Sequence, residues 1–75
     1  MSMKKNFAAK IKTQSKWLDT LNQRKEALER RLSYLDTMKG INTRSEQARL
    51  KTELADVEIR MVKARSRISR ARAQL

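Results

Sequence analysis

The last sixteen residues of the chain, RMVKARSRISRARAQL, contain six Arg or Lys residues and no Asp or Glu. The guanidinium group of Arg offers a planar fork of N–H donors that fits a phosphate or a base edge, and the ammonium group of Lys offers a compact positive charge. A surface built from such groups binds anions. The alternative is that these charges only keep a helix face in solution, and the position of the remaining charges decides between the two.

The first eighteen residues repeat this pattern with Lys alone. Together the two terminal segments hold eleven basic residues and no acidic ones: Lys4, Lys5, Lys10, Lys12, Lys16, Arg60, Lys63, Arg65, Arg67, Arg70 and Arg72. Residues 19–59 hold eight basic and eight acidic residues, so the whole net charge of +11 lies in the terminal segments. A solvated helix face intersperses charges of both signs, whereas unrelieved positive charge favours an anionic partner.

Other kinds of chemistry find little support in the composition. The chain has no His and no Cys, so we expect no metal site, and the carboxylates are spread over polar helix faces rather than grouped. No Gly-rich phosphate loop is present, and we expect neither catalysis nor a cofactor. No apolar run approaches the ~20 residues of a membrane span, so we expect a soluble, intracellular, cytoplasmic protein.

Two heptad patterns predict the elements that carry these charges. Pro is absent, Gly occurs once, and strong helix formers dominate the composition. In the first half, the seam positions recur in steps of three and four at Phe7, Ile11, Gln14, Leu18, Leu21, Lys25, Leu28, Leu32 and Leu35. In the second half, they recur at Leu50, Leu54, Val57, Met61, Ala64, Ile68, Ala71 and Leu75. Each half therefore predicts one long helix with a single apolar seam.

The two patterns are out of phase by one residue, and the slip falls within MKGINTRSE. Gly40 is suited to the position just after a helix, and Thr43 with Glu46 fits a capping box at the start of the next one. The prediction is one domain over residues 1–75, with a first helix at about 5–39, a turn at about 40–43 and a second helix at about 44–74. The fold class is all-α: a two-helix antiparallel coiled-coil hairpin.

Folding the chain about residue 41 tests this prediction, because every seam residue then meets a seam residue of the other helix, except that Leu35 meets Gln47. The charged flanks also oppose one another in this register: Arg31 to Glu53, Glu29 to Lys51, Asp36 to Arg44 and, as a like-charge pair, Arg24 to Arg60. An antiparallel hairpin brings its two ends together at the end away from the turn. The basic segments should therefore form one surface, the open end.

A second, weaker apolar stripe lies outside the seam. It comprises Ala48, Ala55, Ile59 and Val62 of the second helix, with Tyr34 on the first. Scattered apolar residues on a surface need no special role. The alternative is a face for oligomerisation or for a partner, with two hairpins forming a homodimeric four-helix bundle or joining a larger complex.

These patterns lead us to expect a non-enzymatic helical hairpin that binds nucleic acid through its open end. Charge alone does not separate RNA from DNA. The only Trp of the chain, Trp17, either packs on the stem of Arg67 or stacks on an exposed base. The alternative function is a protein-interaction module, such as an adaptor, inhibitor or assembly factor, docked on an acidic partner. A membrane surface is disfavoured, since Phe7 and Ile11 already belong to the seam.

Overall fold

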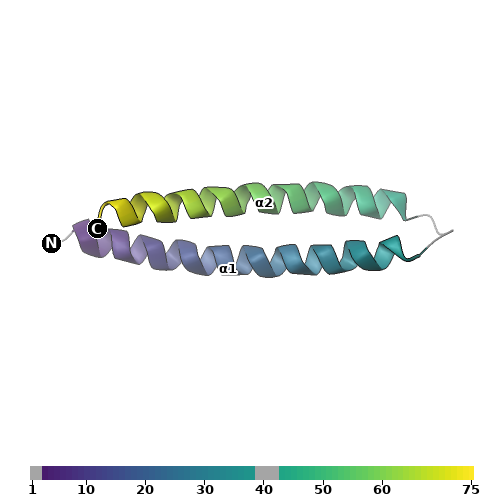
Figure 1. Cartoon of the computed structure of the whole chain (residues 1–75), viewed down its shortest axis with the longest axis horizontal. Helices are drawn as coiled ribbons and strands as arrows, with labels where there is room; N and C mark the ends of the chain where they lie inside the picture. Colours follow the sequence, from purple (N-terminus) through teal and green to yellow (C-terminus); the bar gives the residue numbers. More distant parts are fainter. Residues whose placement is uncertain (1–2, 39–42) are drawn as a thin grey trace.

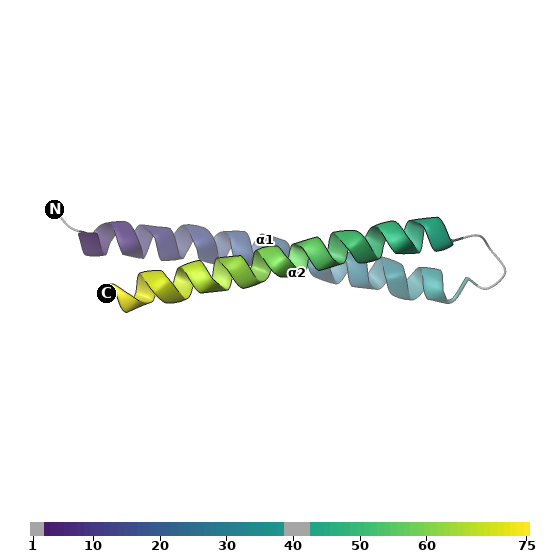
Figure 2. The ribbon, with the colours of Figure 1, turned by 90° about the horizontal axis from the view of Figure 1, so that it is seen from above.

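The chain folds into an all-α helical hairpin. The structure is a computed structural model that describes residues 3–38 and 43–75, with side chains from residue 6 onward. Helix α1 spans Met3–Asp36 and helix α2 spans Arg44–Ala73. Figures 1 and 2 show the two helices side by side and antiparallel, crossing at a shallow angle. The molecule is a rod of 62 × 14 × 13 Å, which confirms the predicted fold class.

The predicted seam forms the interface between the helices. The buried residues are Leu21, Leu28, Leu35, Leu50, Val57, Met61, Ala64, Ile68 and Ala71, and all of them are predicted seam positions. Every other predicted seam position is half-buried, apart from Leu75. A helix positions residues three and four apart on the same face, so a heptad spacing gives one continuous apolar strip on each helix.

The seam changes in character along the rod. Leu and Met side chains form a contiguous core from the turn to the middle of the hairpin, ending at Leu18 and Met61. Beyond this point α2 contributes two alanines, Ala64 with none of its surface exposed and Ala71, together with the buried Ile68, while Phe7 and Ile11 of α1 are half-buried. Small side chains bury less apolar surface. The open end is therefore the more weakly packed part of the hairpin.

Helix α1 ends earlier than the sequence predicts, at Asp36 instead of residue 39. The Thr37 hydroxyl donates to the Tyr34 carbonyl at 2.7 Å, and the N–H groups of Thr37 and Met38 donate to Tyr34 and Leu35 at 3.1 Å. These bonds return to the third residue back, which tightens the last turn and closes the helix. Gly40 and most of the predicted turn lie outside the described residues.

Helix α2 begins where expected, although the predicted capping box is wrong. Thr43 is the N-cap residue, and its carbonyl accepts the first helical hydrogen bond from the N–H of Gln47 at 2.9 Å. The Thr43 side chain makes no capping hydrogen bond. The Glu46 carboxylate instead accepts a hydrogen bond from Arg31 of the other helix at 2.8 Å. The tertiary contact competes with the local cap for the same carboxylate.

The far end of α2 differs from the prediction by one residue. The helix ends at Ala73, and the N–H groups of Gln74 and Leu75 donate to Ala71 and Arg72 at 3.1 Å. Leu75 lies beyond the helix and is 54% exposed, so its predicted place in the seam is wrong. A heptad position requires helical geometry, and the chain has left that geometry before Leu75.

The ion pairs between the helices are shifted by one heptad from the expected ones. Arg24 pairs with Glu53, and the Nε of Arg31 lies 2.8 Å from Glu46. The predicted pairing of Arg31 with Glu53 is wrong, and so is the predicted position of Arg24 opposite Arg60. Each arginine reaches the glutamate one heptad nearer the turn. Both arginines thereby gain an acidic partner, and a like-charge contact is avoided.

The hydrogen bond between Arg31 and Glu46 also shifts their titration. It raises the pKa of Arg31 and lowers the pKa of Glu46, because the bond favours the charged form of each group. Arg31 also lies over the ring of Tyr34, 5.4 Å from its centroid. Exposed pairs of this kind contribute little to stability. Their effect is on the alignment of the helices.

Gln14 is, with Lys25, one of two polar residues at the predicted seam positions. It is half-buried, and its Oε1 atom is buried without a hydrogen-bond partner. Replacing Gln14 by Leu removes an unsatisfied acceptor, so we expect the free energy of unfolding to rise by about 1–3 kcal/mol. Thermal denaturation followed by circular dichroism measures this change. The matched control is Gln23→Leu at an exposed position, and an equal effect of the two substitutions would contradict the prediction.

Candidate nucleic-acid interface

The antiparallel fold brings the two basic segments of the chain together. In Figure 1 the first turns of α1 and the last turns of α2 lie at the same end of the rod, opposite the turn. The sequence has no acidic residue in 1–18 or 60–75, so this open end holds only positive side-chain charges. The charge pattern of two segments far apart in sequence becomes one local surface.

One side of the open end has a hollow lined by three cations. Lys10 comes from α1, and Arg67 and Arg70 come from α2, with Phe7, Ala71 and Gln74 completing the wall. Lys10 and Arg67 each precede a seam residue, which places them on the same flank of the interface. The hollow combines an apolar floor with three positive charges. Such a surface is suited to a phosphate group with an attached sugar or base.

A second hollow lies on the opposite flank. Arg65 and Arg72, two turns apart on α2, line it together with the hydroxyl-bearing residues Ser15 and Ser69 and the seam residues Leu18 and Ile68. Guanidinium and hydroxyl groups are both hydrogen-bond donors to phosphate oxygens. Ser15 was not among the predicted site residues. Its signal in the sequence is its position immediately after the seam residue Gln14, on the same flank as Arg65 and Arg72.

Three predicted residues, Lys12, Lys16 and Lys63, have exposed side chains and do not line either hollow. They add positive charge around the site without belonging to its walls. Lys4 and Lys5 lie in the first turns of α1, but their side chains fall outside the described residues. The structure therefore separates the walls of the site from the charges that surround it.

Arg60 differs from the other basic residues of the open end. Its Nε lies 3.0 Å from Asp56, one turn earlier on the same helix. Within residues 6–38 and 43–75, no ion pair involves Lys63, Arg65, Arg67, Arg70 or Arg72. Arg60 thus marks the boundary between the charge-balanced middle of the rod and the open end, and its predicted role in binding is the weakest of the set.

Trp17 has 41% of its surface exposed and lies two turns from Lys10 on the same flank of α1. A cation–π contact between Trp17 and Arg67 was one of its two expected roles. The cation–π contact found in the described part of the chain is between Arg31 and Tyr34. The structure therefore shows no cation–π contact between Trp17 and Arg67, and Trp17 does not line the three-cation hollow.

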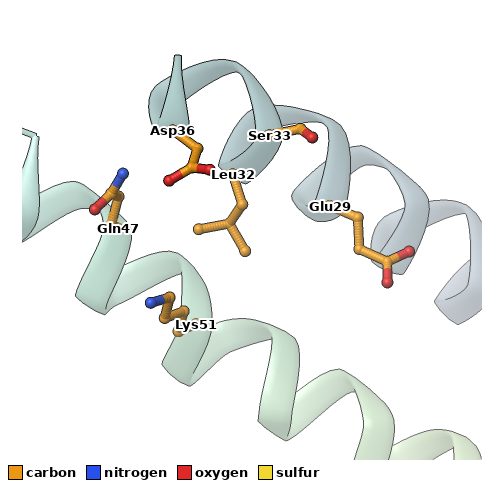
Figure 3. Close-up of a pocket in the computed structure, with 6 residues that line it drawn as sticks. All are labelled: Glu29, Leu32, Ser33, Asp36, Gln47 and Lys51. Carbon is orange, nitrogen blue, oxygen red and sulfur yellow. The ribbon is translucent and has the colours of Figure 1, made fainter. Parts of the chain in front are cut away.

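The end of the rod near the turn has a different character. Figure 3 shows a hollow lined by Glu29, Leu32, Ser33, Asp36, Gln47 and Lys51, in which two carboxylates accompany one ammonium group. The expected ion pairs of Glu29 with Lys51 and of Asp36 with Arg44 are absent from the described residues. This hollow does not concentrate positive charge, so the candidate anion site is confined to the open end.

The second apolar stripe divides between two sides of the hairpin. Ala48, Ala55, Ile59 and Val62 share the outer side of α2, directly opposite its buried seam, with Ile59 55% and Val62 62% exposed. Tyr34 is also exposed, but it lies on the outer side of α1, which faces the other way. The role of these five residues in oligomerisation or partner binding stays a prediction.

Within residues 3–38 and 43–75, no group of three potential metal-ligating side chains occurs, and neither helix is long and apolar enough to cross a membrane. What the site offers chemically is a set of positive charges and hydrogen-bond donors next to an exposed indole ring. Comparisons with protein-family models, with curated protein sequences and with solved structures found no match to this chain.

Proposed function

We propose that this protein is a non-enzymatic helical hairpin that binds nucleic acid through its open end. The observation that carries the proposal is the convergence of cations from both helices on one hollow and of two arginines of α2 on a second, in a region whose sequence contains no carboxylate side chain. Positive charges that repel one another are stabilised when an anion binds between them. A regularly charged polyanion engages several of these cations along the rod at once, which a small anion does not.

The shape of the open end supports nucleic acid as the anion. Arg65 and Arg72 are seven residues apart on α2, or about 10 Å at 1.5 Å per residue. The open end is thus long enough to contact several consecutive phosphates. The exposed ring of Trp17 lies on the same flank as Lys10, where it can stack on an unpaired base. A nucleic-acid ligand agrees with the cytoplasmic location expected from the sequence.

The proposal predicts a steep dependence of affinity on salt. The logarithm of the affinity falls linearly with the logarithm of the salt concentration. Each phosphate contact makes this slope more negative by about 0.9 on B-DNA and about 0.7 on single strands. If all five unpaired cations of α2 engage phosphates, we expect a slope of roughly −4.5 on duplex DNA. Fluorescence anisotropy with labelled duplex DNA, duplex RNA and single-stranded RNA measures this slope, and quenching of the single Trp reports base stacking.

The result of this salt series also addresses the alternative function. Weak binding to all three nucleic acids, lost near 0.15 M salt with a slope near −1, would contradict the proposal. The open end would then be assigned to an acidic protein surface, as in an adaptor, inhibitor or assembly factor. A preference for single-stranded RNA with Trp quenching would identify the class of nucleic acid that the open end binds.

A further inference from the structure

The outer face of α2 is a separate apolar surface that the nucleic-acid proposal does not use. Ala55, Ile59 and Val62 line a shallow hollow there, flanked by Glu58 and Lys63. This face points directly away from α1, so the hairpin itself has no means of covering it. The exposed area of the molecule is 6010 Å². A compact protein of 8.8 kDa is expected to expose roughly 4,800 Å².

The charges around this face are arranged with opposite signs on either side of Ile59. Asp56 and Glu58 lie just before Ile59, and Lys63 and Arg65 lie just after it. Consider a second copy of α2 that runs antiparallel over the first. Its Lys63 and Arg65 then lie beside Asp56 and Glu58 of the first copy, and the reverse contact forms on the other side of the axis. A parallel copy places like charges together. The face is therefore complementary to itself in the antiparallel orientation only.

The position of Ile59 supports the same arrangement. Helix α2 spans Arg44–Ala73, so its midpoint falls between residues 58 and 59. A two-fold axis at Ile59 thus overlaps the two copies of α2 along their full length. In this register Ile59 meets Ile59 of the second copy, and Ala55 meets its Val62. Asp56 already pairs with Arg60, yet a carboxylate has further lone pairs to accept from Lys63 of the second copy.

The charge of the open ends also favours the antiparallel orientation. A parallel dimer brings two open ends together, each free of acidic side chains, and so doubles the repulsion. The antiparallel dimer places residues 60–74 of each copy beside residues 44–58 of the other, which hold three basic and four acidic side chains. We propose that two copies of this hairpin associate through the outer faces of their α2 helices, antiparallel, about a two-fold axis at Ile59.

This dimer has a consequence that rests on the proposed function. The two ends of α2 at Ala73 lie about 40 Å apart in the dimer, because each is fourteen residues from the axis at 1.5 Å per residue. A dimer of this form offers two nucleic-acid-binding ends that point in opposite directions. It is therefore able to join two segments of nucleic acid. The dimer itself is tested without nucleic acid.

The mass in solution gives the first test. Sedimentation equilibrium of the full chain should give about twice the monomer mass of 8.8 kDa. Val62→Glu should weaken self-association by about tenfold or more, because it buries a charge in the apolar centre of the interface. The matched control is Tyr34→Glu, which changes an equally exposed residue on the outer side of α1 and should leave the dimer intact.

Disulfide cross-linking tests the orientation, and the chain has no Cys of its own to interfere. Ile59→Cys should cross-link to itself on mild oxidation, and Val62→Cys should cross-link with Ala55→Cys in a mixture. Two Val62→Cys chains should not cross-link, since the two positions are offset by about 9 Å along the axis. A wild-type mass of 8.8 kDa up to about 1 mM, or rapid self-cross-linking of Val62→Cys, would overturn the proposal.

Discussion

Replacing Arg65, Arg67, Arg70 and Arg72 together by Gln should reduce the affinity for nucleic acid by about a thousandfold at 0.15 M salt. Each lost phosphate contact removes a slope of about 0.9, and four such contacts at this salt concentration correspond to three powers of ten. The fold should persist, because all four side chains are exposed and Gln has nearly the helix propensity of Arg. Anisotropy titrations and far-ultraviolet circular dichroism measure the two effects.

The hairpin supplies a matched control for this variant. Arg30, Arg44, Arg49 and Lys51 are exposed, lie toward the turn, and take part in none of the ion pairs of the described residues. Replacing these four by Gln lowers the net charge by the same four units, from +11 to +7. If the open end is the binding surface, this control should lose less than about tenfold in affinity. Equal losses in both variants would mean that total charge, not its location, governs binding.

The seam could be predicted from the sequence because its physical cause is periodic. A buried strip along a helix requires apolar residues every three to four positions, and this spacing is visible without any knowledge of the partner helix. Leu28 and Val57 are buried where the pattern predicts. The phase slip between the two halves likewise indicates a hairpin instead of one continuous helix. The antiparallel fold also brings the two basic segments together at one end of the rod.

The details at the helix ends and flanks could not be predicted, because several groups compete there for the same partner. The Glu46 carboxylate has two available roles, the cap at Thr43 and the contact with Arg31, and only the folded arrangement decides between them. The last turn of α1 closes on the Thr37 hydroxyl before the chain reaches Gly40. The local sequence indicates which groups are able to form each contact. The tertiary structure determines which of these contacts forms.

The candidate site was predicted as a set of charges, and the structure resolves that set into walls and surroundings. Arg72 lines a hollow with Ser15, whereas Lys12 and Lys63 lie outside both hollows. Whether a residue lines a hollow depends on the side of the seam on which it lies. It also depends on how the two helices are aligned along the rod. The separation of Tyr34 from the stripe of α2 has the same origin, since the pattern on each helix does not reveal that the two exposed sides face opposite directions.

Leu28→Ala is expected to remove most of the stability of the hairpin and to unfold up to about half of the molecules. Leu28 is 4% exposed and belongs to the contiguous core, where such a truncation costs about 2–5 kcal/mol. A domain of this size has a total stability of only about 5 kcal/mol. Loss of helical circular dichroism and of a cooperative thermal transition measures the effect. The matched control is Leu75→Ala, the same chemical change at a residue that is 54% exposed, and it should alter stability by less than about 0.5 kcal/mol.

Nucleic acid should restore the helicity of Leu28→Ala, because the open end exists only when the two helices pair. A ligand at a hundred times its dissociation constant stabilises the folded state by about 2.7 kcal/mol, which is comparable with the loss from the truncation. In the background of the four Arg→Gln substitutions the same ligand should restore little. Unchanged affinity in a chain that stays unfolded would contradict this coupling, since the basic segments would then bind without being brought together. Restored helicity that depends on the four arginines would mean that the core of the rod and its basic end act as one folded unit.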